Sequence, residues 1–538
     1  MKSCPNCNAK LKNGAKQCEN CGTEISSKRN SHSADKALNL KGALKVVIPV
    51  IAVLVVAAVI VSLFATPNEN ANYFGYFRDG QLFVSDYSEG YGEQASENFK
   101  KDNAVFGNYR DFIRISNDSK KLFFLDNYDG SSYKLYYKNT NQMDAKANKI
   151  TSDVLTYDIS DKGDIVTYIK DAGNLYQHNL KMQSDLIDNN VVNFLVTDNG
   201  QTVLYKKNSE GDKQYQFDLY ISKSGQKGKK LISSVDSFQY ISDDLSIVYY
   251  VSGGSLYKLT VGKNSKKIAE NVREVIKVYD SGEIFFTKTN DNGSSALYYY
   301  SGSKTSKALV ENYYRTEAVS SEKPVIIVCS DNEKISYSVI VKDKAFELKY
   351  DIVSIALNNA GNEVNFTADF DTNTQLTTLY TAQIDSGLKS VKKVTDGVFQ
   401  GKYISGEMYV YVKDYEPATM MGTLYYNNKI IGKDVYYSSL KYCKQDNSLL
   451  YFDKNDDLNA RLNKFVKGKS SVVRDNVLMN SLSVSNDSKV IFLADCYNSD
   501  GILFAYENGK LIKIDHDVTS AFTILSNEEY DLKVHMNF

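Results

Sequence analysis

The chain has 538 residues, with 64 Lys and Arg against 65 Asp and Glu, 41 Tyr, 24 Phe, five Pro and no Trp. This length exceeds what one ordinary core serves, so we expect several domains or a repeat. The net charge of −1 argues against a nucleic-acid binder over the bulk of the chain, and the Tyr-rich, Pro-poor composition indicates an all-β fold.

Two Cys-x-x-Cys pairs open the chain, Cys4 with Cys7 and Cys18 with Cys21. Four thiolates in two tight turns complete the closed tetrahedral shell of a structural zinc site, so we expect one Zn²⁺ here. A segment this short cannot fold on its own core, and metal binding would supply the folding energy. The alternative is a redox dithiol pair. Residues 1–25 resemble the short zinc ribbons at the start of many bacterial membrane proteins.

An apolar run from Val46 to Ala65 follows a basic linker over 26–45, and only Pro49 and Ser62 interrupt it. Twenty helical residues span roughly 30 Å, the thickness of the hydrocarbon core of a bilayer. Pro49 falls in the first turn, where its missing N–H costs nothing. The sequence therefore predicts a single transmembrane helix at 46–65. A cleavable signal peptide is the alternative, but the preceding segment is too long and no A-x-A site follows.

The orientation follows from positive charges. Residues before the run include Lys28, Arg29, Lys36, Lys41 and Lys45, whereas 66–77 contains no Lys or Arg. The positive-inside rule then places the N-terminus in the cytoplasm and the rest of the chain outside, as a single-pass plasma-membrane protein. Residues 66–78 are expected to form an extracytoplasmic linker.

From residue 79 onward one turn pattern recurs, in which Asp, Asn, Gly or Ser residues precede a short apolar strand. These turns begin at Ser116, Ser160, Thr197, Ser242, Tyr279, Asn358 and Ser485. A strand containing the dipeptide Leu-Tyr follows most of these turns. Its tyrosine is Tyr136, Tyr176, Tyr220, Tyr257, Tyr298, Tyr380 or Tyr425, and Phe504 occupies the matching place in the last unit. The successive gaps are 40, 44, 37, 41, 82, 45 and 79 residues, so two degenerate units lie around Tyr337 and Leu462.

A period near 40 residues with about four short strands is typical of β-propeller blades. The turns, above all 116–120 and 485–489, resemble the Ser-Pro-Asp-Gly-Lys turn of TolB-like, PD40- or WD40-like bacterial propellers. The resemblance implies an architecture and no catalytic residue. About ten units and an opening fragment at 80–86 favour two tandem rings, over 79–317 and 318–538; one large ring is the alternative. The opening strand is expected to pair with the last unit and close a ring.

No nucleotide-binding loop, nucleophile elbow or histidine metal motif occurs among the sequence patterns. We therefore expect a non-enzymatic protein whose outer propeller binds a protein, peptide or glycan and is tethered to the zinc ribbon. The alternatives are a transmembrane sensor and, less favoured, a lyase- or glycosidase-like propeller enzyme. The repeated tyrosines are interpreted as packing residues rather than a ligand-binding face. The scattered Cys329, Cys443 and Cys496 are interpreted as small buried apolar residues.

Overall fold

The computed structural model describes residues 73–87, 90–96, 112–182, 184–210, 215–332, 334–456, 459–485, 487–497 and 500–524. The chain divides into two units, Met1–Asn68 and Glu69–Phe538, and the description concerns the second. The predicted zinc ribbon and the apolar run 46–65 lie outside the described residues and stay predictions. In the part of the chain that is described, no helix has the length and apolar character needed to cross a membrane.

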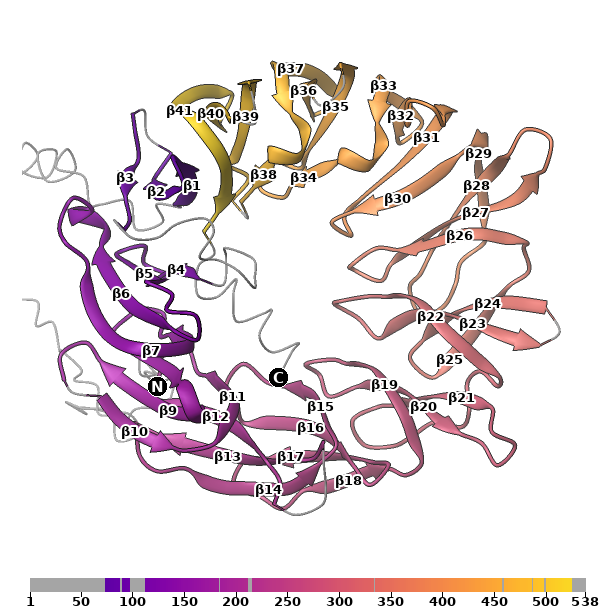
Figure 1. Cartoon of the computed structure of the whole chain (residues 1–538). Coiled ribbons are helices and arrows are strands. Elements are labelled where there is room, and N and C mark those ends of the chain that lie inside the picture. The colour runs from indigo at the N-terminus through magenta and orange to yellow at the C-terminus, as the bar shows by residue number, and fades with distance from the viewer. Residues whose placement is uncertain are drawn as a thin grey trace, which may run out of the picture. The chain divides into compact units, whose positions relative to one another are not determined.

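The described strands form consecutive antiparallel sheets (Figure 1). The first two sheets share the bent strand β7, and their strands are β4 (Ile113–Ile115), β5 (Lys121–Asp126), β6 (Tyr133–Asn139), β7 (Asn148–Ile159), β8 (Ile165–Lys170), β9 (Asn174–Asn179) and β10 (Ser184–Asp188). The third and fourth contain β11 (Val191–Val196), β12 (Thr202–Asn208), β13 (Phe217–Lys223), β14 (Lys229–Val235), β15 (Ser237–Ile241), β16 (Ile247–Ser252), β17 (Ser255–Thr260) and β18 (Lys266–Ala269).

The fifth, sixth and seventh sheets follow in the same way. Their strands are β19 (Val272–Val278), β20 (Ile284–Thr289), β21 (Ser295–Tyr300), β22 (Tyr313–Val319), β23 (Val325–Asn332), β24 (Lys334–Val341), β25 (Lys344–Leu348), β26 (Ile352–Leu357), β27 (Glu363–Asp371), β28 (Leu376–Gln383) and β29 (Lys392–Val398). The eighth and ninth sheets contain β30 (Gln400–Ile404), β31 (Met408–Glu416), β32 (Met421–Tyr426), β33 (Lys429–Tyr436), β34 (Lys441–Cys443), β35 (Ser448–Asp456), β36 (Asn459–Val466) and β37 (Lys469–Leu478).

The last two sheets share the long strand β41. Their strands are β38 (Ser483–Val484), β39 (Val490–Tyr497), β40 (Asp500–Glu507) and β41 (Lys510–Thr523), followed by β1 (Phe74–Arg78), β2 (Gln81–Ser85) and β3 (Glu93–Gln94) from the beginning of the described chain. Short 3₁₀ turns are η3 (Thr140–Gln142), η4 (Asp171–Gly173), η5 (Tyr437–Ser439) and η6 (Met479–Ser481). The described strands form seven hydrogen-bonded sheets; divided into meanders at β7, at β41 and at the links β33–β35 and β37–β39, they give the eleven units that are called sheets here, and the described residues contain no α-helix.

Each sheet is a meander of four strands, or of three in the fifth sheet, which are called A to D in the order of the meander, with A innermost along the row of sheets (Figure 1). The predicted turns join strands A and B. In all seven of them the fourth residue has a positive φ, at Ser119, Gly163, Gly200, Leu245, Gly282, Gly361 and Ser488. Glycine adopts this left-handed conformation without steric cost, which explains its frequency in the pattern. The turn prediction is confirmed.

The Leu-Tyr strands are the C strands, and their aromatic residue lies directly opposite an aromatic residue of strand B. The stacked cross-strand pairs are Phe124–Tyr136, Tyr168–Tyr176, Tyr205–Tyr220, Tyr250–Tyr257, Phe286–Tyr298, Phe366–Tyr380, Tyr411–Tyr425 and Phe492–Phe504. In the two degenerate units the matching strand B residue has no aromatic partner, because Val328 lies opposite Ser338 and Tyr451 lies opposite Asn463. The periodic tyrosines are therefore packing residues, since cross-strand aromatic contacts stabilise a sheet.

Apolar clusters fill the space between successive sheets. One cluster joins Phe285 of the fifth sheet to Ile326 of the sixth, and another joins Ile327 of the sixth to Phe366 of the seventh. The predicted boundary between residues 317 and 318 therefore falls inside β22, in a sheet that packs on both of its neighbours.

The two ends of the described chain meet in the eleventh sheet. Strand β1 pairs with β41, from Phe74 opposite Thr523 to Arg78 opposite Val518, and β2 pairs with β1. The buried carboxylate of Asp515 accepts hydrogen bonds from the Tyr76 hydroxyl at 2.8 Å and the Arg78 guanidinium at 2.7 Å. Strand β1 lies within residues 66–78, the range that the sequence assigned to a linker. The repeat pattern does not reveal this strand, because the strand precedes the first turn of the repeat.

Candidate functional site

The meander topology gives the sheets two different rims. The A–B and C–D turns lie on one rim, called the turn face, while the B–C turns and the crossings from strand D to the next strand A lie on the other, called the crossing face. On the turn face, the backbone N–H of Asn117 donates to the Asp161 carbonyl at 2.8 Å, and Asp161 N–H donates to Asp198 at 2.7 Å. Further along, Asn359 N–H donates to the Gly406 carbonyl at 2.9 Å. These bonds hold neighbouring turns at fixed distances.

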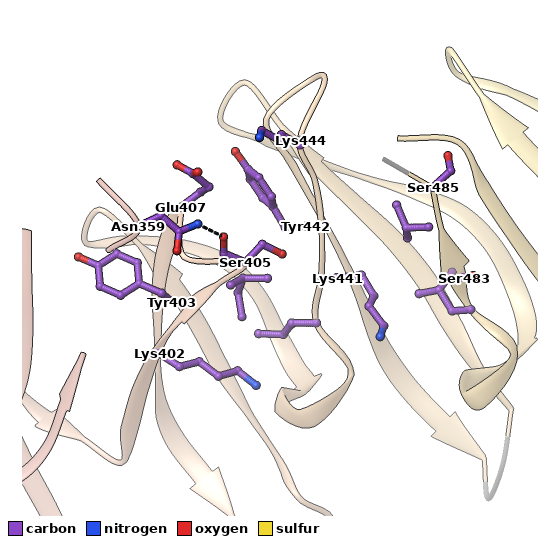
Figure 2. A pocket seen from close by; sticks show the side chains of 14 residues that line it. Asn359, Lys402, Tyr403, Ser405, Glu407, Lys441, Tyr442, Lys444, Ser483 and Ser485 are labelled. Atoms are coloured by element: carbon purple, nitrogen blue, oxygen red, sulfur yellow. Dashed lines mark hydrogen bonds between the residues drawn. The ribbon is translucent and has the colours of Figure 1, made fainter. Parts of the chain in front are cut away.

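A cavity of about 600 Å³ opens next to this last contact, along the inner strands of the eighth, ninth and tenth sheets (Figure 2). We call it the inner pocket. Its lining residues are Asn359, Lys402, Tyr403, Ile404, Ser405, Glu407, Leu440, Lys441, Tyr442, Lys444, Leu482, Ser483, Val484 and Ser485. The Asn359 side-chain amide donates to the Ser405 carbonyl at 2.9 Å and fixes the rim of the pocket.

Three lysines and one glutamate give the inner pocket its charge. Lys441 and Lys444 are exposed, whereas Lys402 is half-buried and donates to the Tyr437 carbonyl at 3.1 Å. The Lys402 ammonium also lies 4.3 Å from the centre of the Tyr437 ring. Burial lowers the pKa of Lys402, because desolvation disfavours its charged form. Figure 2 shows Lys402 and Lys441 on neighbouring inner strands, with Lys444 and Glu407 nearer the turn face.

A second hollow, of about 740 Å³, lies on the crossing face between the sixth and seventh sheets. We call it the crossing groove. Its lining residues are Tyr314, Arg315, Asp331, Lys334, Ile335, Tyr337, Asp351, Ile352, Val353, Asp369 and Phe370. Four of these are large apolar side chains that remain exposed, by 55% at Tyr314, 53% at Val353, 50% at Phe370 and 39% at Ile335.

The charges of the crossing groove are partly paired. Arg315 forms an ion pair with Glu317 at 2.8 Å, and Lys334 forms one with Asp351. Asp369 accepts a hydrogen bond from the Tyr380 hydroxyl at 2.5 Å, and this carboxylate, with burial, raises the pKa of Tyr380 to about 12. Two cations against three carboxylates line the groove, which is therefore slightly acidic.

The predicted zinc ligands Cys4, Cys7, Cys18 and Cys21 lie outside the described residues. Within the residues that are described, no group of three His, Cys, Asp or Glu side chains could hold a metal ion. Asp129 accepts hydrogen bonds from the backbone N–H groups of Ser131 and Ser132, each at 3.0 Å. These bonds lower the pKa of Asp129 to about 2. They give this carboxylate a turn-forming role.

The three outer cysteines are free thiols. Cys329 and Cys443 are fully buried, as the sequence predicted, whereas Cys496 is only half-buried. Burial raises the pKa of all three thiols. Neither hollow was predicted from the sequence, because the lining residues of each come from separate strands that only the fold brings together.

No protein-family model matches the chain, and no curated protein matches its sequence. Solved structures are similar to it at low identity. A structure described as the eukaryotic initiation factor matches with a TM-score of 0.38 and 9% identity, over 84% of this chain and 98% of that chain. The tricorn protease matches with a TM-score of 0.26 and 11% identity, over 84% of this chain and 63% of its own. The β-propeller domain of the Trilobed protease from Pyrococcus furiosus matches at 0.27 and 12%, over 53% and 97%. The described part of this chain is an all-β, propeller-like array of blades.

Proposed function

We propose that this chain is a non-enzymatic, single-pass membrane protein whose extracytoplasmic β-propeller binds a peptide segment of a partner protein in the crossing groove. Residues 46–65 are its anchor. The cytoplasmic zinc ribbon, with one structural Zn²⁺ on Cys4, Cys7, Cys18 and Cys21, forms the inner end. The charge asymmetry around the anchor supports this orientation.

The observation that carries the proposal is the exposed apolar surface of the crossing groove. Tyr314, Ile335, Val353 and Phe370 come from two neighbouring sheets and line one hollow. Soluble surfaces rarely expose large apolar side chains together unless a partner covers them. Tyr and Phe side chains also contribute flat contact area at low entropic cost, which is typical of protein-recognition surfaces.

The charged side chains of the crossing groove indicate which kind of peptide would bind there. Asp331 and Asp369 line the groove beside the apolar side chains, and the cations Arg315 and Lys334 are both paired with carboxylates. A peptide with apolar side chains next to a lysine or arginine would therefore match the groove in both shape and charge.

We also propose that the eleven sheets close into one ring rather than two. The shared clusters on either side of β22–β25 and the pairing of β1 with β41 support this arrangement. Residues of the eleventh sheet, such as Phe77 and Phe522, also pack with Phe123 of the first. In a single ring, the crossing groove would lie on one continuous crossing face.

Site-specific crosslinking in intact cells tests the function. A photoreactive amino acid replaces Val353 in the full-length chain, and the matched control replaces Val472, which is equally exposed at 53% but lies in the outer strand β37. We expect a defined crosslinked partner from position 353 alone, and its loss when Phe370→Asp is added. Equal crosslinking from both positions, or crosslinks insensitive to Phe370→Asp, would contradict the proposal.

The anchor is tested separately. Full-length chain purified in detergent should contain one zinc per molecule, and Cys18→Ser should remove it, because three thiolates leave the tetrahedral shell incomplete. External protease should degrade residues beyond 70 in intact cells and leave the N-terminal segment protected. The reverse pattern of protection would contradict the proposed orientation.

A further inference from the structure

We propose that the inner pocket is a second binding site, for a hydroxyl-rich anion of which an acidic sugar is the simplest example. Its carboxylate or phosphate group would lie between Lys402 and Lys441, with Lys444 towards the turn face, and its hydroxyl groups would meet the polar side chains of the lining. The site lies on inner strands and the turn face, apart from the crossing groove.

Equivalent positions on four inner strands support an anionic ligand for the inner pocket. Arg114, Asp158, Lys402 and Lys441 occupy the same register position on four inner strands, opposite Phe123, Thr167, Val410 and Leu450 of the respective B strands. On the adjacent inner strands β4 and β7, Arg114 and Asp158 form a buried ion pair at 2.5 Å. On the adjacent inner strands β30 and β34, the same two positions are both lysines.

Neighbouring like charges repel, and an acid normally lies between them. None of the three lysines, Lys402, Lys441 and Lys444, forms an ion pair within 4.0 Å with a carboxylate of the described residues. Among the described residues of the lining, Glu407 is the one acidic residue. The nearby Asp446 is bound to Lys464 at 2.6 Å. The pocket therefore holds three cations against one carboxylate, and an anionic ligand would supply the missing charge.

The remaining groups of the lining suit a hydroxylated ligand. The Tyr403 hydroxyl lies 2.8 Å from a Glu363 carboxylate oxygen, and the Tyr442 hydroxyl donates to Asn447 at 3.0 Å, so both rings are held in place. The polar side chains of Ser405 and Ser483 border the same cavity. A volume of about 600 Å³ is in the usual range for a small-molecule site and accommodates one or two sugar rings.

Calorimetric titration of the full-length chain in detergent tests the proposal, with D-glucuronate and glucose 6-phosphate as probes. We expect at least one acidic sugar to bind, and D-glucose and inorganic phosphate to bind at least about tenfold more weakly, because each lacks half of the recognised chemistry. Lys441→Gln should weaken the binding by about tenfold or more, since it removes a charge-assisted hydrogen bond.

Lys469→Gln is the matched control, because Lys469 is an exposed lysine of the same sheet on its outer strand. It should leave the affinity unchanged. Lys441 is itself exposed, so its substitution is not expected to unfold the sheet. The proposal is wrong if neither acidic sugar binds at about 10 mM, if glucose or phosphate binds equally well, or if Lys441→Gln and Lys469→Gln behave alike.

Discussion

Closure of the eleventh sheet depends on Asp515, and the variant Asp515→Asn tests this. The carboxylate is fully buried, and one oxygen accepts both from Tyr76 at 2.8 Å and from Arg78 at 2.7 Å, while the other accepts from the His516 N–H at 2.8 Å. An asparagine retains one acceptor and turns the other oxygen into a donor, which then faces the Arg78 donor.

The expected cost is about 3 kcal/mol. The lost bond from Arg78 is charge-assisted, but the guanidinium is 25% exposed, so it counts at the low end of about 1.5–3 kcal/mol. The Tyr76 hydroxyl still accepts from the Gly92 N–H at 2.9 Å, but its own hydrogen loses its acceptor, which adds about 1–1.5 kcal/mol. Because 1.4 kcal/mol changes an equilibrium constant tenfold, local opening of the β1–β41 pair should become about 100-fold more frequent.

Hydrogen exchange of the full-length chain measures this opening, because the amides between β1 and β41 are protected only while the sheet is closed. Asp517→Asn is the control: Asp517 is two residues away, exposed, and has a φ of 56°, which asparagine tolerates. We expect exchange in 74–78 to accelerate in Asp515→Asn alone. Unchanged exchange there, or equal acceleration in Asp517→Asn, would refute the role assigned to Asp515.

Three further predictions concern packing, turns and thiols. Phe366→Ala should destabilise the seventh sheet by about 3–5 kcal/mol, because it empties a fully buried site and removes the stack on Tyr380; faster hydrogen exchange in β27 and β28 would report it, and unchanged exchange would contradict the packing role. Ser119→Gly should stabilise by about 0.5–1 kcal/mol in urea unfolding, since Ser119 has a φ of 56°, and a loss of stability would show that its side chain matters more. A thiol reagent should modify Cys496 in the folded chain well before Cys443, because Cys443 is buried. The rate of modification should increase with pH, because burial raises the pKa of both thiols and the thiolate is the reactive form. Equal rates for the two thiols would contradict the burial difference.

The repeat could be predicted because its signals are local. A left-handed fourth turn residue favours glycine, which occupies four of the seven turns, and a stacked pair requires an aromatic residue at a fixed distance along the C strand. Where these demands relax, the pattern fades. Val328 opposite Ser338 is one such place, and Tyr451 opposite Asn463 is the other, yet both sheets form because their apolar burial is intact.

The two hollows could not be predicted because they depend on relations between blades. Lys402 and Lys441 are equivalent only once the register of β30 and β34 is known, and neither strand is followed by the recognised turn pattern. The groove residues Val353 and Phe370 resemble ordinary strand residues in the sequence. Their exposure follows from lying near strand ends on the crossing face, where no neighbouring strand covers them.

The eleventh sheet depends both on local sequence signals and on contacts between segments far apart in the chain. Strand β1 has the aromatic composition of a buried strand, but it has no partner nearby in sequence on its other edge, and only β41 supplies one. A sheet completed by the two ends of a chain forms late, because joining distant segments costs loop-closure entropy that local hairpins do not. Its edge strands would otherwise expose unpaired N–H and C=O groups. The buried Asp515, bound to Tyr76 and Arg78, therefore stabilises a junction between strands that are far apart in the sequence.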